Sequence, residues 1–135
     1  MKSRLRHRKQ RGFTLIEMII VISIIFILTG IAAPIYSAHL QRAREAVLKE
    51  DLYTMRNAID QYTMDKNKAP QTLDDLVTAG YMARIPPDPM TRATDTWQAV
   101  QEDVFLNPEQ TDPGISDVHS GSSQVASDGT AYNTW

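Results

Sequence analysis

Residues 11–36 of the chain read RGFTLIEMIIVISIIFILTGIAAPIY. Only one charged side chain, Glu17, stands between residues 13 and 36. At about 1.5 Å per residue, a helix of this length spans the roughly 30 Å hydrocarbon core of a bilayer. The stretch therefore predicts a transmembrane helix over residues 13–36, followed by a domain of about 100 residues.

Charge is unevenly distributed along the chain. The sequence has 14 Lys or Arg and 16 Asp or Glu residues, with a net charge of −2. Six basic residues and no acidic residue precede Gly12, so the remainder is acidic and nucleic acid is not an expected partner. A basic arm directly before an apolar segment is typical of a topology signal that stays in the cytoplasm. Residues 37–135 are therefore expected to be exported.

A helical stripe follows the apolar segment. Apolar residues recur at intervals of three and four, which predicts that the helix continues to about residue 66 and buries one face. These residues are Leu48, Leu52, Met55, Ile59 and Tyr62. Charged residues are expected on the opposite, solvated face: Glu45, Lys49, Glu50, Arg56, Asp60 and Lys66.

Two positions are expected to break this long helix. Gly30 and Pro34 are its weak points, because Gly costs about 1 kcal/mol and Pro about 3 kcal/mol in a helix interior. Asn67 and Pro70 are expected to end it.

The rest of the chain predicts short elements. Thr72 and Asp75 resemble a capping box before a helix over residues 73–79. Three prolines make residues 85–91 an extended connection. Residues 97–100, 104–106 and, more weakly, 115–118 have strand-like composition, which predicts a small antiparallel sheet and an α+β fold. Residues 119–135 have the Ser/Gly content of a disordered tail, but Tyr132 and Trp135 indicate one that folds back.

The sequence offers no catalytic constellation. His7, His39 and His119 are not paired at metal-binding spacing. Asp117, His119 and Ser120 are residue types of a catalytic triad, but residues so close in one loop seldom adopt that geometry. The chain is therefore not expected to be an enzyme. It also lacks cysteine, so another staple, such as a metal ion or neighbouring subunits, is expected to support its thin core.

The segment Arg11-Gly12-Phe13-Thr14-Leu15-Ile16-Glu17 is the most specific motif. Here the chain resembles the type IV pilin and pseudopilin family. The resemblance implies that a prepilin peptidase removes residues 1–12 as a leader, cutting after Gly12, and that the new amino group of Phe13 is N-methylated. Pro34 and the segments YMARIPPDPM and TDTWQAV look like those of major pseudopilins of type II secretion.

The resemblance implies a pilin fold and a structural function. A helical spine, transmembrane over residues 13–36, would pack on a small antiparallel sheet within the domain of residues 37–135. Subunits in the inner membrane would form a homopolymer, a periplasmic pseudopilus for protein secretion. The implied partners are minor pseudopilins, an inner-membrane platform protein, an assembly ATPase and the prepilin peptidase/N-methyltransferase. Glu17 would pair with the Phe13 amine of a neighbouring subunit, because a lone acid in a membrane helix is rarely left unpaired. A pairing within one chain is the alternative, because residues 13 and 17 are four apart on a helix.

The resemblance also implies calcium. Major pseudopilins have a C-terminal calcium-binding loop, and Asp117, Ser120 and Asp128 lie in the matching region. The composition of this loop alone is a weak signal, because it has hard oxygen ligands without EF-hand spacing.

Three alternatives remain at the level of sequence. An ordinary signal peptide would be cut near residues 30–32, but the apolar segment is longer than such peptides require. A single-pass anchor would carry a binding domain that never polymerises. A true type IV pilus subunit is the nearest alternative, and the absence of cysteine favours a pseudopilin, because many such pilins have a C-terminal disulfide.

Overall fold

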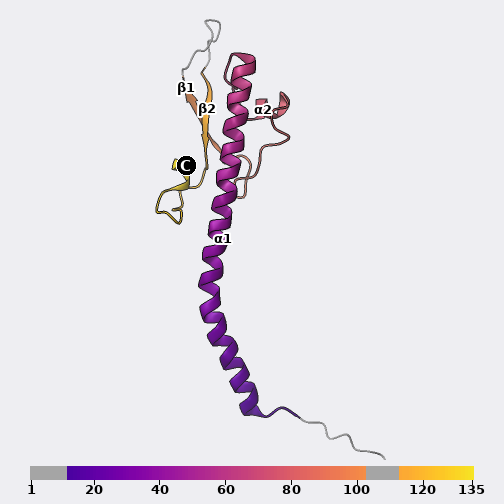
Figure 1. Ribbon diagram of the computed structural model, residues 1–135, viewed down its shortest axis with the longest axis vertical. Coiled ribbons are helices and arrows are strands. Elements are labelled where there is room, and N and C mark those ends of the chain that lie inside the picture. The colour runs from indigo at the N-terminus through magenta and orange to yellow at the C-terminus, as the bar shows by residue number, and fades with distance from the viewer. Residues whose placement is uncertain (1–11, 103–112) are drawn as a thin grey trace, which may run out of the picture. The chain divides into compact units, whose positions relative to one another are not determined.

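The structure, a computed structural model, describes residues 12–102 and 113–135 (Figure 1). Its elements are α1 (Leu15–Lys66), α2 (Asp74–Thr78), β1 (Gln98–Glu102), β2 (Gly114–His119) and the short 3-10 helix η1 (Tyr132–Thr134). A long helix with a small antiparallel sheet confirms the predicted α+β fold. The chain divides into two compact units, Met1–Ala38 and His39–Trp135.

The helix α1 continues through Gly30 and Pro34, so the predicted helix break is not found. Pro34 has no N–H to donate to the Gly30 carbonyl, which removes one bond from the ladder. The turns on either side remain helical, and polar side chains bond within them. Thr29 Oγ1 donates to the Ile25 carbonyl at 2.7 Å, and Ser37 Oγ donates to the Pro34 carbonyl at 2.9 Å. One missing bond therefore does not end this helix.

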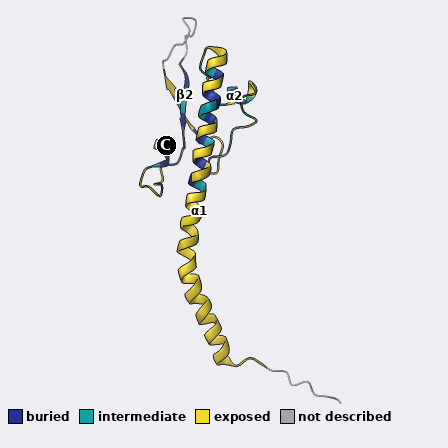
Figure 2. Cartoon of the chain, viewed as in Figure 1, coloured by how far each residue is buried: buried dark blue, intermediate teal, exposed yellow. Residues whose placement is uncertain are grey.

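The apolar part of α1 is entirely exposed. Every residue from 12 to 43 is exposed, as Figure 2 shows for this part of the helix. The exposed side chains are large: Phe13 is 76% and Phe26 is 76% accessible. By length and composition this part of α1 can cross a membrane, and no residue of its apolar window is buried. A continuous apolar surface of this size requires lipid or another protein.

The core lies in the second unit. There α1 buries the stripe that its three- and four-residue spacing predicts. The side chains that pack against this stripe come mainly from the strands and from the C-terminal segment, residues 120–135. The buried apolar residues are Leu48, Leu52, Met55, Ala58, Ile59, Tyr62, Leu76, Trp97, Ile115, Val118, Ala126 and Tyr132.

The ends of the two helices follow from their sequence. Asn67 has a φ of 49°, a left-handed conformation that asparagine tolerates at a helix end, and α1 ends just before it. Asp75 Oδ2 accepts hydrogen bonds from the N–H groups of Gln71 and Thr72, both at 2.9 Å, which supplies the carboxylate half of the predicted capping box. Gly80, with a φ of 85°, follows the last residues of α2 and the C-cap residue Ala79.

The sheet consists of β1 and β2, paired antiparallel. Gln98 pairs with His119, and Glu102 pairs with Gly114. The register shifts between Val100 and Gln101, which leaves Ser116 of β2 as the extra residue of a bulge. Two of the three predicted strands are thereby confirmed. The third, over residues 104–106, lies outside the described residues.

The C-terminal segment folds back on the domain. Tyr132 is 1% exposed, which agrees with the prediction made from Tyr132 and Trp135. The segment begins with a close approach, because a Cβ atom on Gly121 would lie 2.0 Å from the Thr96 carbonyl oxygen. Only glycine allows the backbone to pass there without displacing its neighbour.

Candidate functional site

The N-terminal end of α1 carries a capping box. Thr14 precedes the first helical residue, and its Oγ1 accepts a hydrogen bond from the Glu17 N–H at 3.3 Å. Glu17 Oε2 in turn accepts a hydrogen bond from the Thr14 N–H at 3.4 Å. These reciprocal bonds satisfy two of the N–H groups that a helix leaves without intrahelical partners. The Thr-x-x-Glu spacing of Thr14 and Glu17 in the sequence is a signal that could have identified this capping box.

The capping box turns the Glu17 carboxylate toward the start of the helix, where the residues of the predicted cleavage site lie. Gly12, Phe13 and Glu17 are all exposed. A Cβ atom on Gly12 would have no heavy atom within 4 Å, so nothing in the described chain restricts this position. Cleavage after Gly12 and pairing of Glu17 with a neighbouring Phe13 amine involve other molecules, and both stay predictions.

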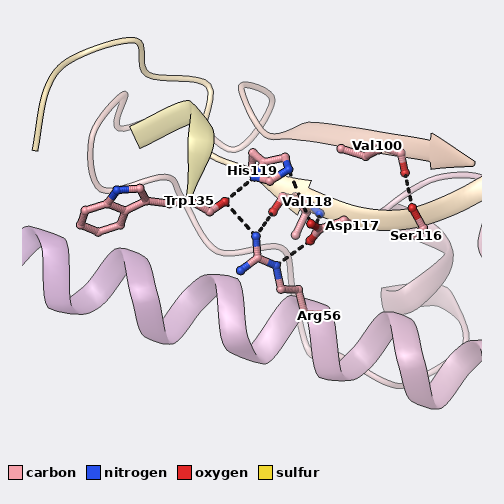
Figure 3. Close-up of polar contacts among 7 residues, drawn as sticks. All are labelled: Arg56, Val100, Ser116, Asp117, Val118, His119 and Trp135. Atoms are coloured by element: carbon pink, nitrogen blue, oxygen red, sulfur yellow. Dashed lines mark hydrogen bonds and ion pairs between the residues drawn. The ribbon is translucent and has the colours of Figure 1, made fainter. Parts of the chain in front are cut away.

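A second group of polar side chains fixes the C-terminal segment, residues 120–135, to α1 and to the proline-rich connection over residues 85–91, and Arg56 is its first member (Figure 3). Arg56 Nε lies 2.6 Å from Asp117 Oδ1, and Arg56 Nη2 donates to the main-chain oxygens of Val118 at 3.0 Å and Trp135 at 2.8 Å. Burial raises the pKa of Asp117, but the bond from Arg56 and the Val118 N–H outweigh it, so that this pKa is lowered. Arg56 thereby connects β2 with Trp135.

Glu45 is the second member, and its position corrects the sequence analysis. It was expected on the solvated face, yet it is only 6% exposed. The spacing explains this, because Glu45 stands three residues before Leu48 and therefore extends the buried stripe by one position. Its carboxylate accepts bonds from the Ser127 N–H at 2.7 Å, the Ser127 hydroxyl at 2.5 Å and the Tyr132 hydroxyl at 2.8 Å.

Asp88 is the third member, and it is fully buried. Its Oδ2 accepts bonds from the Ser120 hydroxyl at 2.6 Å and the Gly121 N–H at 3.2 Å. Its Oδ1 accepts the Met90 N–H at 2.8 Å. A buried carboxylate needs such donors, because an unpaired buried charge is costly. Asp88 therefore joins the proline-rich connection to the start of the C-terminal segment. Its role was not foreseen, and only the tertiary fold reveals it.

The three residues expected to bind calcium each bond to a different protein group. Asp117 pairs with Arg56, and Ser120 donates its hydroxyl to Asp88. Asp128 Oδ1 accepts bonds from the N–H and the hydroxyl of Thr130, at 2.9 and 2.6 Å. Within residues 12–102 and 113–135, no group of three or more His, Cys, Asp or Glu side chains is arranged to hold a metal ion. The described donors do not fit a calcium site, and calcium binding stays a prediction of the resemblance.

The residues of catalytic type do not form a triad. The Ser120 hydroxyl is directed at Asp88 rather than at His119. His119 Nδ1 contacts the Trp135 main-chain oxygen, and its Nε2 lies 3.5 Å from Asp117 Oδ2. Asp117 is bonded to Arg56 as well, so these groups are structural.

Comparisons with known proteins find a family model that matches the N-terminal part of the chain and relatives that match over most of its length. The family model described as the prokaryotic N-terminal methylation motif matches residues 7–33. The type II secretion system core protein G of Aeromonas hydrophila is 33% identical, over 63% of this chain and 71% of that protein. The protein of the same name from Escherichia coli K12 is 34% identical, over 60% and 67% of the two chains. That of Klebsiella michiganensis is 29% identical, over 84% and 93%. No solved structure matches the chain significantly.

The methylation motif, the exposed apolar helix and the small α+β domain define a pilin-like protein with an N-terminal helix of the prepilin type. More particularly, the chain belongs to the family of the type II secretion system core protein G, the pseudopilins. These relatives are structural components and not enzymes, which confirms the expectation that the chain is not an enzyme.

Proposed function

We propose that the chain is the structural subunit of a pseudopilus that polymerises from the inner membrane and takes part in type II protein secretion. In this proposal a prepilin peptidase removes residues 1–12, and Phe13 is N-methylated. Before assembly, the chain is anchored in the inner membrane, with residues 37–135 in the periplasm. Its partners are further copies of itself, minor pseudopilins, the platform protein and the assembly ATPase.

The exposure of residues 12–43 is the observation that supports this proposal most strongly. Within the described residues, the large apolar side chains from Phe13 to Tyr36 are exposed, whereas those of the core are buried. Lipid covers such a surface while the subunit is a monomer. In a polymer, the same surfaces of neighbouring helices cover one another, and each Glu17 meets a Phe13 amine.

Electron microscopy tests the proposal. The full chain is expressed together with a type II secretion assembly apparatus, and then without its ATPase. Short periplasmic filaments that require the ATPase are expected. Long external fibres would instead indicate the subunit of a type IV pilus. A membrane-held chain that gives no filaments with the apparatus present would contradict polymerisation and favour an anchored domain.

A further inference from the structure

The Glu45 carboxylate organises the C-terminal segment, residues 120–135, from within the buried stripe of α1. Three of its contacts come from this segment: the N–H and hydroxyl of Ser127 and the hydroxyl of Tyr132. A fourth comes from Gln41 Nε2, one helical turn earlier, at 3.2 Å. Bonds from neutral donors to a charged acceptor are among the stronger hydrogen bonds in proteins.

The loop between Ser127 and Tyr132 has its own internal bonds. The Ala126 N–H donates to the Thr130 carbonyl at 2.7 Å, and Val125 forms an isolated β-bridge with Ala131. Residues 125–131 therefore form a small closed loop. Glu45 bonds to Ser127 at the beginning of this loop and to Tyr132 just after it.

Two of the three anchors of this segment, the carboxylates of Glu45 and Asp88, have opposite requirements to those of a calcium loop. Calcium binds several oxygen acceptors of a loop and requires them to be free. Here the loop presents donors, the N–H and O–H groups of Ser120, Gly121, Ser127 and Tyr132, to carboxylates that come from elsewhere in the fold. A cation placed among these groups would have to displace bonds that are already made.

We infer that the C-terminal segment of this chain is held in place without calcium. Glu45 of α1 takes the stabilising role that the family resemblance implies for a calcium ion. The inference concerns the folded subunit and does not depend on filament formation.

Hydrogen exchange of the full chain in detergent micelles tests the inference. Exchange is followed for the peptide that contains Ser127, and thermal unfolding is followed in parallel, with excess calcium and with excess chelator. The wild-type chain is expected to give the same exchange and the same melting temperature in both. Protection by calcium, or a lower melting temperature with chelator, would overturn the inference.

Two variants test Glu45 itself. Glu45→Gln keeps the size of the side chain and removes its charge, and exchange of the Ser127 peptide is expected to accelerate about tenfold or more, with or without calcium. Ser127→Ala removes one donor to Glu45 and is the alternative test if Glu45→Gln does not fold. It is expected to accelerate hydrogen exchange less, and only in the same peptide.

The matched control is Glu50→Gln, the same change at an exposed position of the same helix. It is expected to leave exchange of the Ser127 peptide unchanged. If neither Glu45→Gln nor Ser127→Ala accelerates exchange more than this control, Glu45 is not the staple and the inference fails.

Discussion

Arg56 Nε donates to Asp117 Oδ1 at 2.6 Å, across 61 residues of sequence. The pair itself is more than one third exposed, at 37% and 39% of the two side chains, so its direct electrostatic contribution is small. The two further bonds of Arg56, to the main chain of Val118 and Trp135, make it a three-way connection.

Arg56→Lys is expected to lower the free energy of unfolding by about 1–3 kcal/mol, because an ammonium group cannot reproduce the planar fork of three directed bonds. Urea denaturation of the full chain in detergent measures it. Arg42→Lys, the same change at an exposed position of α1, is the control and should have almost no effect. Equal stability of the two variants would show that the main-chain bonds of Arg56 contribute little.

Substitution at Gly12 is expected to block maturation without disturbing the fold. Because a Cβ atom at this position would have no heavy atom of the described chain within 4 Å, Gly12→Leu is expected to affect recognition by the peptidase and not the fold. Intact mass spectrometry of chains expressed with a prepilin peptidase measures it. The wild type should begin at a methylated Phe13, whereas the variant should retain its leader. A wild-type chain that begins near residue 33 would show that an ordinary signal peptidase acts instead.

Glu17→Leu is expected to prevent filament assembly while the monomer stays in the membrane. A filament of this variant would bury the Phe13 amine without a counter-ion, and breaking one side of a buried pair typically costs about 3–5 kcal/mol. Glu17→Asp should be intermediate. Filament yield and membrane-bound monomer are compared at matched expression. Normal filaments from Glu17→Leu would exclude the charge-pairing mechanism.

Thr14→Val separates this mechanism from helix capping, because it removes the hydroxyl that bonds to the Glu17 N–H and leaves the carboxylate in place. Loss of an N-cap costs about 0.5–2 kcal/mol, so this variant should assemble better than Glu17→Leu. Equal loss in both would assign Glu17 to capping alone.

Acid is expected to loosen the C-terminal segment through Glu45. Burial raises the pKa of Glu45, but the bonds from Ser127, Tyr132 and Gln41 outweigh it, and this pKa is lowered from 4.5. Burial raises the pKa of Tyr132, so its hydroxyl remains a donor. Because the folded-state pKa of Glu45 is depressed, its contribution to stability is complete above about pH 5 and is lost as pH falls through the folded value.

Urea midpoints measured between about pH 6 and pH 3 should therefore decline in the wild type and decline less in Glu45→Gln. Parallel curves for the two chains would mean that Glu45 does not titrate with unfolding.

Asp51 is expected to have the opposite effect to Glu45, because its ionised carboxylate lowers the stability of the folded chain. Burial and the neighbouring carboxylates of Asp88 and Glu50 raise its pKa from 3.8. A raised pKa in an acid means that the ionised form destabilises the folded state at neutral pH and that the penalty disappears at low pH. Asp51→Asn should therefore raise the free energy of unfolding at pH 7 by up to about 1 kcal/mol, seen as a higher melting temperature, and give no gain near pH 3. Asp60→Asn, at an exposed position of α1, is the control.

Periodicity made much of this fold predictable. Residues 13–36 and the stripe from Leu48 to Tyr62 identified the long helix, because both patterns depend only on the pitch of a helix. The same spacing, extended by three residues, would have found Glu45, but a charged residue was assigned to solvent by its type alone. The break expected at Gly30 and Pro34 is not found in this structure. Helix propensity gives the free-energy cost of these two residues, and the neighbouring helical turns can offset that cost.

The polar anchors were beyond prediction from the sequence. Asp88 and Ser120 are separated by 32 residues, and nothing local shows that one accepts a bond from the other. The same residue types, Asp and Ser, also occur both as calcium ligands and in hydrogen-bonded pairs. Only the positions of the surrounding donors distinguish them, and these positions depend on the tertiary fold.

The anchoring of residues 120–135 by α1 has a consequence for the order of folding. Glu45 bonds to residues 82 and 87 positions later, and Arg56 bonds to one 79 positions later. The helix is synthesised long before these partners exist, so the part of its stripe next to Glu45 and Arg56 stays uncovered until residues 120–135 have been synthesised. Such long-range contacts close late and slow folding. During this interval the uncovered part of the stripe can associate with other chains, and the subunit is most vulnerable to misassembly before residues 120–135 have been synthesised.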